Sequence, residues 1–424
     1  MKNPRPSWSY LLLIILAGES VFFLPYVLVR VFRPTVLEVF QIDNIQLGIC
    51  FSVYGFVAVF SYLFGGPIAD KYSPRKLIAF ALWLTSIGGI VYASYPSYTV
   101  LKILYGYWGI TTVLLFWAPM IKATRIWGGV SSQLKAFGYL EGGRGLFGAL
   151  LVALGVMIFA FFMKDVNSTG LNESRDAFKY VIYISSFIVA FVGVLVWFCM
   201  KLNDEQEKKV VLEKITLSQI GQVLKLPSVL LLMIIVLSAY MGYKTTDIIS
   251  LYAKEVMRYD QVESAQIATF LLYARPVISI LIAIVLFKVE GGLLLLGGFV
   301  ISFFSALLFA LGIISSSTTM LFVLSILSLA IGVYGLRALY FSVMEKGNIP
   351  LIYTGTAVGL ISIVGYTPDI FSGPIIGYLL ENFKGDQGYQ YIFLILAGFS
   401  FVGGIASWKY HKLYGNKIYI FKKK

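Results

Sequence analysis

Long apolar segments separated by short polar loops dominate this sequence. A bilayer core about 30 Å thick requires about 20 apolar residues per helical span, and a span must satisfy its own backbone hydrogen bonds. Barrel strands would be about ten residues long with alternating polarity, a pattern absent here. We therefore expect transmembrane helices near residues 8–33, 45–68, 77–95, 98–121, 136–163, 178–200, 227–253, 265–287, 293–314, 319–343, 353–380 and 389–410.

The longest polar break lies between the sixth and seventh segments, from Lys201 to Lys225. It contains the run Asn-Asp-Glu-Gln-Glu-Lys-Lys at 203–209, which is typical of a solvated linker. The expected fold class is an all-α polytopic membrane protein. Its expected organisation is an N-terminal six-helix bundle at 1–200, a cytoplasmic linker at 201–226, and a C-terminal six-helix bundle at 227–424 with a short basic tail.

The composition agrees with a membrane protein and argues against a water-soluble enzyme. Of 424 residues, 58% are hydrophobic and 13% are charged, whereas soluble domains are about 45–50% apolar and about 25% charged. The spans contain no catalytic His, Ser or metal constellation. Cys50 and Cys199 lie in apolar segments without metal-ligand spacing, so neither a metal nor another cofactor is expected.

The basic charge is distributed unevenly between the loops. Lys and Arg total 34 against 21 Asp and Glu, a formal net charge of +13. Roughly 21 basic residues occupy the N-terminus, the even-numbered loops and the C-terminus, and roughly 8 occupy the odd-numbered loops. Because cations gather in cytoplasmic loops, both termini are predicted to be cytoplasmic, in a plasma or bacterial inner membrane. This topology explains the charge without a nucleic-acid partner.

A motif lies between the second and third segments, in the sequence GGPIADKYSPRK at 65–76. Its glycine permits close helix approach, its acid can pair with a helix N-terminus or a basic neighbour, and its cations face the inner leaflet. The motif resembles the cytoplasmic loop signature of the major facilitator superfamily, with Pro74 in place of the second glycine. The resemblance implies a cytoplasmic gate formed by Gly66, Asp70, Lys71, Arg75 and Lys76.

Membership of that superfamily implies a monomeric secondary transporter that works by alternating access. The implied fold has two six-helix bundles related by a pseudo-two-fold axis, with a small-molecule site near mid-membrane between them. A weaker resemblance connects Tyr26–Arg30, Asp247 and Tyr252–Val256 to the organophosphate:phosphate antiporter branch. Gly242 stands where that branch has its second basic residue, and Lys244 follows two positions later. The sequence therefore permits, but does not establish, a phosphate-binding site formed by Arg30 and Lys244.

Nine ionisable residues lie inside the apolar segments, where a charge that faces lipid is costly. Glu141 and Arg144 are three residues apart, as are Lys244 and Asp247, so both pairs can close locally. The rest would then leave one uncompensated positive charge, which attracts anions. Candidate substrate-binding residues are Arg30, Arg144, Lys244, Arg275, Arg337, Tyr273 and Tyr366, and candidate proton-coupling carboxylates are Glu19, Glu141, Asp247 and Asp369.

Structural alternatives remain for several of these residues. Arg30, which an eleven-residue spacing places on the same helix face as Glu19, could snorkel to the outer interface. The Glu141–Arg144 pair could serve only helix packing, and Arg337 could tie the cytoplasmic gate. Asp369, which follows Pro368, could cap a broken helix.

The leading functional hypothesis is transport of a small organic anion, a carboxylate or a phosphate ester. The coupling would be to protons or to counter-anion exchange. One alternative is proton-driven efflux of an amphipathic compound or of a metal chelator such as a siderophore. Another is a ligand sensor that does not transport. The sequence pattern does not distinguish import from export.

Overall fold

A computed structural model describes residues 7–128, 133–163, 171–200, 221, 223–285, 289–340, 343–347, 349, 354–383 and 385–415. Most of the predicted linker at 201–226 and the end of the basic tail lie outside these residues. The side chains of Gly66, Asp70 and Lys71 also lie outside the description. The regular structure of the described residues is helical throughout.

The first half of the chain contributes its helices in sequence order. They are α1 (Trp8–Phe22), the π-helix η1 (Phe23–Val27), α2 (Leu28–Val31), α3 (Arg33–Phe40), α4 (Asn44–Lys71), α5 (Pro74–Ala93), α6 (Tyr98–Gly109), the π-helix η2 (Ile110–Leu114), α7 (Trp117–Gly128), α8 (Gln133–Phe162) and α9 (Leu171–Cys199).

The second half of the chain also contributes its helices in sequence order. Its helices are α12 (Pro227–Thr245), the 3₁₀-helix η3 (Thr246–Ile248), α13 (Ile249–Glu255), α14 (Gln261–Val285), α15 (Gly291–Ala310), α16 (Thr319–Leu339), the 3₁₀-helix η4 (Met344–Gly347), α17 (Thr354–Gly365), α18 (Pro368–Asn382) and α19 (Gln387–Tyr414).

Within the described residues, eleven helical segments are long and apolar enough to cross a membrane. They coincide with eleven of the predicted segments. The segment predicted at 265–287 is also helical, because α14 runs for 25 residues through it. The prediction of a polytopic, all-helical membrane protein is confirmed.

Several spans are interrupted about a third of their length from one end. Pro25 has no N–H to donate to the carbonyl of Val21, and the first span passes through the π-helix η1 at that point. The span Pro227–Glu255 changes to a 3₁₀ turn at Thr246–Ile248, and Pro368 separates α17 from α18. These interruptions lie beside Arg30, Asp247 and Asp369.

The apolar cores follow the two halves of the chain, with one exception. The first core is built from residues between Tyr10 and Met200, joined by Ala265, Ala268 and Leu272 of α14. Two further cores comprise residues from the second half only, apart from a peripheral contact of Leu37. Helix α14 therefore packs into the core of the other bundle.

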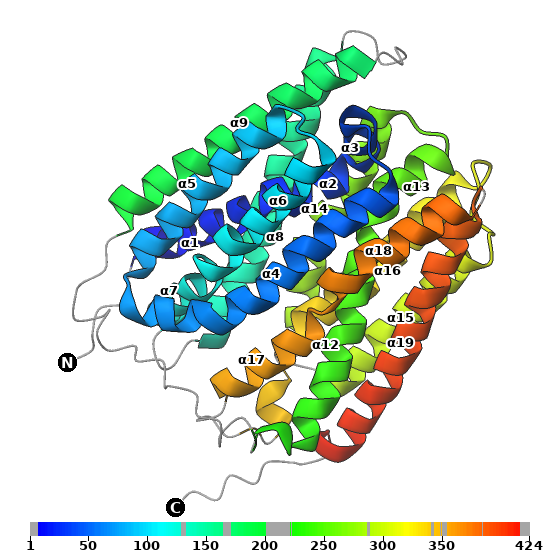
Figure 1. The fold of residues 1–424 in the computed structure, drawn as a ribbon. Helices are drawn as coiled ribbons and strands as arrows, with labels where there is room; N and C mark the ends of the chain where they lie inside the picture. Colours follow the sequence, from blue (N-terminus) through cyan, green and yellow to red (C-terminus); the bar gives the residue numbers. More distant parts are fainter. Residues whose placement is uncertain are drawn as a thin grey trace, which may run out of the picture.

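Helices α4 and α18 meet in a glycine seam, defined by Gly48, Gly55, Gly373 and Gly377 (Figure 1). A Cβ atom at Gly48 would collide with the backbone of Gly373, and one at Gly377 would collide with the backbone of Asn44. Only glycine permits this approach. The seam closes the two bundles against each other over the half of the molecule away from the chain termini (Figure 1).

Candidate substrate site

One buried network of charges connects the first bundle to α14. Arg144 Nη1 lies 2.8 Å from Glu141 Oε1, and its Nε lies 3.4 Å from Glu19 Oε2. Arg275 Nη2 lies 3.1 Å from Glu141 Oε2, and its Nη1 lies 3.9 Å from Glu19 Oε1. Arg144 also donates from Nε to the carbonyl of Gly18. Two carboxylates thus face two guanidinium groups, and their charges balance.

A second network lies where the first and seventh spans meet α18. Arg30 Nε lies 2.5 Å from Asp247 Oδ1, and Arg30 Nη1 donates to the Tyr243 hydroxyl over 2.8 Å. Lys244 Nζ lies 3.2 Å from Asp247 Oδ2 and 3.3 Å from Asp369 Oδ1. This network is also balanced, with two cations and two carboxylates.

Glu19 and Arg30 contact different partners, contrary to the prediction that they share one face of their helix. The π-helical turn of η1 lies between them and takes up one extra residue. One residue corresponds to about 100° of rotation on a helix. Arg30 is consequently turned toward the seventh span, whereas Glu19 faces α8 and α14.

Arg337 is the intramembrane cation that belongs to neither network. Among the described residues it forms no ion pair, and its Nη1 is buried without a hydrogen-bond partner. Its Cζ lies 4.0 Å from the ring centroid of Tyr243, and that of Arg30 lies 4.3 Å from the same centroid. Tyr243 therefore carries two guanidinium groups, one paired with a carboxylate and one not.

Aromatic side chains surround the second network. The Tyr240 hydroxyl donates to Asp369 Oδ1 over 3.0 Å, and its ring contacts that of Tyr366 with centroids 4.7 Å apart. The hydroxyls of Tyr366 and Tyr340 are 3.3 Å apart. Tyr273 is 38% exposed and lies about 200° around α14 from Arg275, so it faces away from the site.

The burial of these residues bears on the structural alternatives. Arg30 is only 4% exposed and bound to Asp247, so snorkelling to the interface is wrong for this conformation. The Glu141–Arg144 pair forms, but Glu141 also contacts Arg275 of the other half. The side chain of Glu141 is 44% exposed while that of Glu19 is 4% exposed. Glu141 is thus the solvent-accessible carboxylate of its network.

The predicted cytoplasmic gate motif is only partly described. Arg75 Cζ lies 6.0 Å from the centroid of a Trp197 ring, and Lys76 is exposed. Lys122, at the predicted end of the fourth span, is buried and donates from Nζ to the carbonyl of Ala69 over 2.8 Å. This bond ties the end of α4 to α7.

A polar latch that no sequence pattern indicated lies at the end of the molecule away from the termini. It is made of Arg33, Asn44 and Glu381 with Glu38 and Gln261. Arg33 Nη2 donates to Asn44 Oδ1 over 2.9 Å, and Asn44 Nδ2 donates to Glu381 Oε1 over 2.9 Å. Gln261 Nε2 donates to Glu38 Oε2 over 2.5 Å. Such residues are common at helix ends, and only their contacts across the bundles distinguish them.

A family comparison decides the identity of the fold. The sequence model described as Major Facilitator Superfamily matches residues 15–372. The chain belongs to the major facilitator superfamily. It is therefore a multi-pass secondary transporter and not an enzyme.

Two curated relatives span nearly the whole chain. Inner membrane protein YqcE of Escherichia coli is 27% identical over 411 residues, covering 93% of this chain and 92% of its own. Inner membrane protein YihN of the same organism is 25% identical over 419 residues, covering 95% of each.

Solved structures confirm the superfamily fold. The nucleoside transporter NupG aligns with a TM-score of 0.71 at 16% identity, covering 96% of this chain and 100% of its own. A bacterial homolog of the human lysosomal transporter Spinster, in an inward-facing and unoccupied conformation, aligns with a TM-score of 0.73 at 15% identity, covering 97% of this chain and 98% of its own.

Proposed function

We propose that this superfamily member transports a small organic anion, a carboxylate or a phosphate ester, by alternating access. The observation that carries the proposal is the guanidinium of Arg337, which forms no ion pair with any described residue and lies beside two charge-balanced networks. Arg337 is partly buried, and its Nη1 lies out of solvent without an acceptor, which is costly unless an anion supplies one. A guanidinium also binds carboxylates and phosphates through two parallel hydrogen bonds.

The anion would bind between Arg337 and the tyrosines of the second half. The guanidinium of Arg337 lies against the ring of Tyr243. Tyr340 follows Arg337 by three residues on the chain, and its hydroxyl lies 3.3 Å from that of Tyr366. Arg30 and Lys244 are bound to Asp247 and Asp369, so they would bind the anion only after leaving those carboxylates. Arg337 is therefore the cation that would contact the anion first.

Coupling is proposed to use the carboxylates of the networks. Glu141 is accessible to solvent and contacts arginines of both halves, and Asp369 holds Lys244 at the break between α17 and α18. Protonation of either would release a cation toward the site. Exchange against a counter-anion requires no such step, and it remains the other form of the proposal.

The proposed orientation places both termini in the cytoplasm. The basic residues concentrated at the N-terminus, the even-numbered loops and the C-terminus support it. The glycine seam and the polar latch both lie at the opposite end, where they hold the bundles together. In this arrangement the end of the molecule opposite the seam and the latch would face the cytoplasm.

A thermal-stability screen followed by counterflow in proteoliposomes tests the proposal. Carboxylates, phosphate esters, sulfonates and uncharged sugars are added to the purified protein, and an anion that binds the native state raises its unfolding temperature. We expect Arg337→Gln to weaken binding of that anion by about tenfold or more, because hydrogen bonds to charged groups contribute about 1.5–3 kcal/mol. Labelled anion should exchange across wild-type vesicles and not across Arg337→Gln vesicles.

Arg258→Gln is the matched control, because Arg258 is exposed in the loop before α14. It removes the same charge far from the networks and should leave the anion's effect unchanged. Stabilisation by an uncharged sugar alone, or an equal response of Arg337→Gln and wild type to the anion, would contradict the proposal. Saturable binding without counterflow would indicate a sensor instead.

A further inference from the structure

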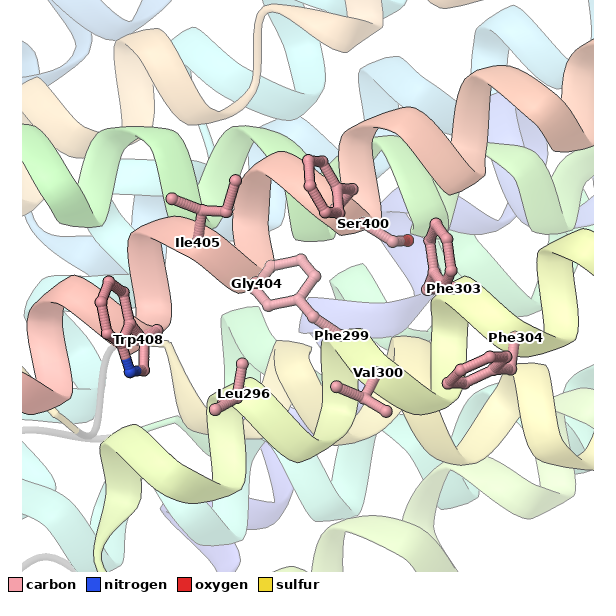
Figure 2. Close-up of a pocket in the computed structure, with 10 residues that line it drawn as sticks. Leu296, Phe299, Val300, Phe303, Phe304, Ser400, Gly404, Ile405 and Trp408 are labelled. Carbon is pink, nitrogen blue, oxygen red and sulfur yellow. The ribbon is translucent and has the colours of Figure 1, made fainter.

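An apolar groove lies between α15 and α19, outside the proposed transport path. Its volume is about 260 Å³, and its lining is almost entirely apolar. Figure 2 shows it between the two helices, with Trp408 at one end and Phe303 and Phe304 at the other. Both helices belong to membrane spans, and many of their large apolar side chains are exposed on this side. The groove therefore opens toward the acyl chains of the bilayer.

Small residues of α19 create the groove. Gly404 and Ser400 leave space between Phe299, Phe303 and Phe401. A Cβ atom at Gly404 would lie 3.7 Å from Phe299 Cβ and 3.9 Å from Leu296 Cδ1, at ordinary contact distance from two residues of the lining. A larger side chain at this position would consequently enter the groove.

The length of the groove matches one leaflet. Leu296 and Phe304 are eight residues apart on α15, about 12 Å along a helix. One leaflet contributes half of the roughly 30 Å hydrocarbon core, about 15 Å. Trp408 lies at the end of the groove nearer the C-terminus of α19, and tryptophan prefers the level of the lipid head groups.

Cations stand at the head-group end. Lys412 Nζ lies 5.5 Å from the centroid of a Trp408 ring, and Lys409 is exposed on the next position after Trp408. The nearby acid Glu290 is already occupied, because it accepts from the backbone of Gly292 and contacts His411 Nδ1 at 2.5 Å. The charge available to a ligand at this end is positive.

We propose that this groove binds one acyl chain of an anionic phospholipid whose phosphate is held by Lys409 and Lys412. Apolar burial gives no driving force inside a bilayer, so the chain is held by packing against the aromatic walls and the head group by charge. Each lysine near an anionic head group contributes attraction worth about a fivefold change in affinity. The site is independent of the anion proposed as substrate.

Native mass spectrometry of the purified full-length protein tests the site. Phosphatidylglycerol and phosphatidylcholine are titrated separately, and retained lipid is counted after detergent removal. Wild-type protein should retain one phosphatidylglycerol in preference to phosphatidylcholine. Gly404→Leu should lose that lipid, and Lys409→Gln with Lys412→Gln should lower the preference for the anionic lipid by about tenfold or more.

Gly398→Leu is the matched control. Gly398 lies on the same helix, exposed and with nothing within 4 Å of an added Cβ atom, and it does not line the groove. Its lipid retention should equal that of wild type, and unfolding temperatures of both leucine variants show whether they fold. Equal retention in Gly404→Leu and wild type, no preference between the two lipids, or a dimer that Gly404→Leu dissociates would overturn the proposal.

Discussion

At the scale of single residues, nine ionisable side chains in apolar helices are arranged so that eight of them form ion pairs within the described residues. An isolated charge in this environment costs far more than a paired one. The carboxylates are therefore shared: Asp247 contacts Arg30 and Lys244, and Glu141 contacts Arg144 and Arg275. Because each carboxylate has two partners, removing any one side chain of a network should lower the stability of the protein.

The Arg30–Asp247 pair yields a test of this sensitivity. Asp247→Asn should destabilise the protein by about 3 kcal/mol, because it leaves the buried guanidinium of Arg30 without its carboxylate. The double variant Arg30→Met with Asp247→Leu should recover most of that loss, since Lys244 keeps Asp369 and the network stays balanced. Thermal unfolding in detergent measures both.

Asp386→Asn serves as the control for the same chemical change. Asp386 is exposed, and its side chain makes no capping hydrogen bond to α19. Its unfolding temperature should equal that of wild type. If Asp247→Asn also unfolds at the wild-type temperature, the ion pair does not carry the stability assigned to it.

The charged residues of the site could be selected from the sequence, but most of their partners could not. Local spacing predicted Glu141 with Arg144 and Lys244 with Asp247, because three residues on a helix bring side chains to one face. Contacts such as Arg275 with Glu141 depend on how two distant helices pack, which no local pattern encodes. Counting the ionisable residues of the spans revealed one excess cation. Only the ion pairs in the structure identify that cation as Arg337.

At the scale of elements, the interrupted helices determine which way the charges face. The twelve predicted segments correspond to helices because hydropathy reports length and burial directly. Hydropathy does not report a π-helical turn, and the assumption of regular helix placed Glu19 and Arg30 on one face. Pro25 was the available signal, since a residue without an N–H breaks the regular bonding.

Pro25→Ala tests the part played by the π-helical turn. Alanine restores a donor at this position and permits a regular α-helix, which would rotate Arg30 by about 100° relative to the start of α1. We expect a loss of stability comparable to that of Asp247→Asn. The losses of Pro25→Ala and Asp247→Asn should be far from additive, because both remove the same ion pair.

Pro227→Ala is the corresponding control, because Pro227 is the first residue of α12, where a helix needs no N–H. It should change the unfolding temperature little. Strict additivity between Pro25→Ala and Asp247→Asn would show that the turn does not orient Arg30.

At the scale of the whole molecule, two different contacts hold the bundles together at the end away from the termini. The glycine seam joins backbones of α4 and α18, and the polar latch joins side chains around Asn44 and Glu381. Alternating access requires this end to open, so both contacts must be reversible. Individual hydrogen bonds contribute little net stability, and glycine contacts involve no interlocking side chains, so both kinds of contact are suited to that requirement.

Alternating access also requires the seam to close again, and a side chain placed in it tests that requirement. A side chain at Gly48 collides with the backbone of Gly373, so Gly48→Leu should hold the seam apart and abolish counterflow of the anion found by the stability screen. Gly398→Leu is the control, because Gly398 is exposed on α19 with nothing within 4 Å of an added Cβ atom, and it should transport like wild type. Counterflow at the wild-type rate in Gly48→Leu would mean that the seam need not close during transport.

The packing of α14 into the first core has a consequence for biosynthesis. Ala265, Ala268 and Leu272 complete a core whose other members all precede residue 201. During synthesis the first bundle therefore exposes the apolar surface that α14 later covers, until the eighth span is inserted. We therefore expect a first half produced alone to be less stable than the same half co-expressed with the second, because α14 completes its core.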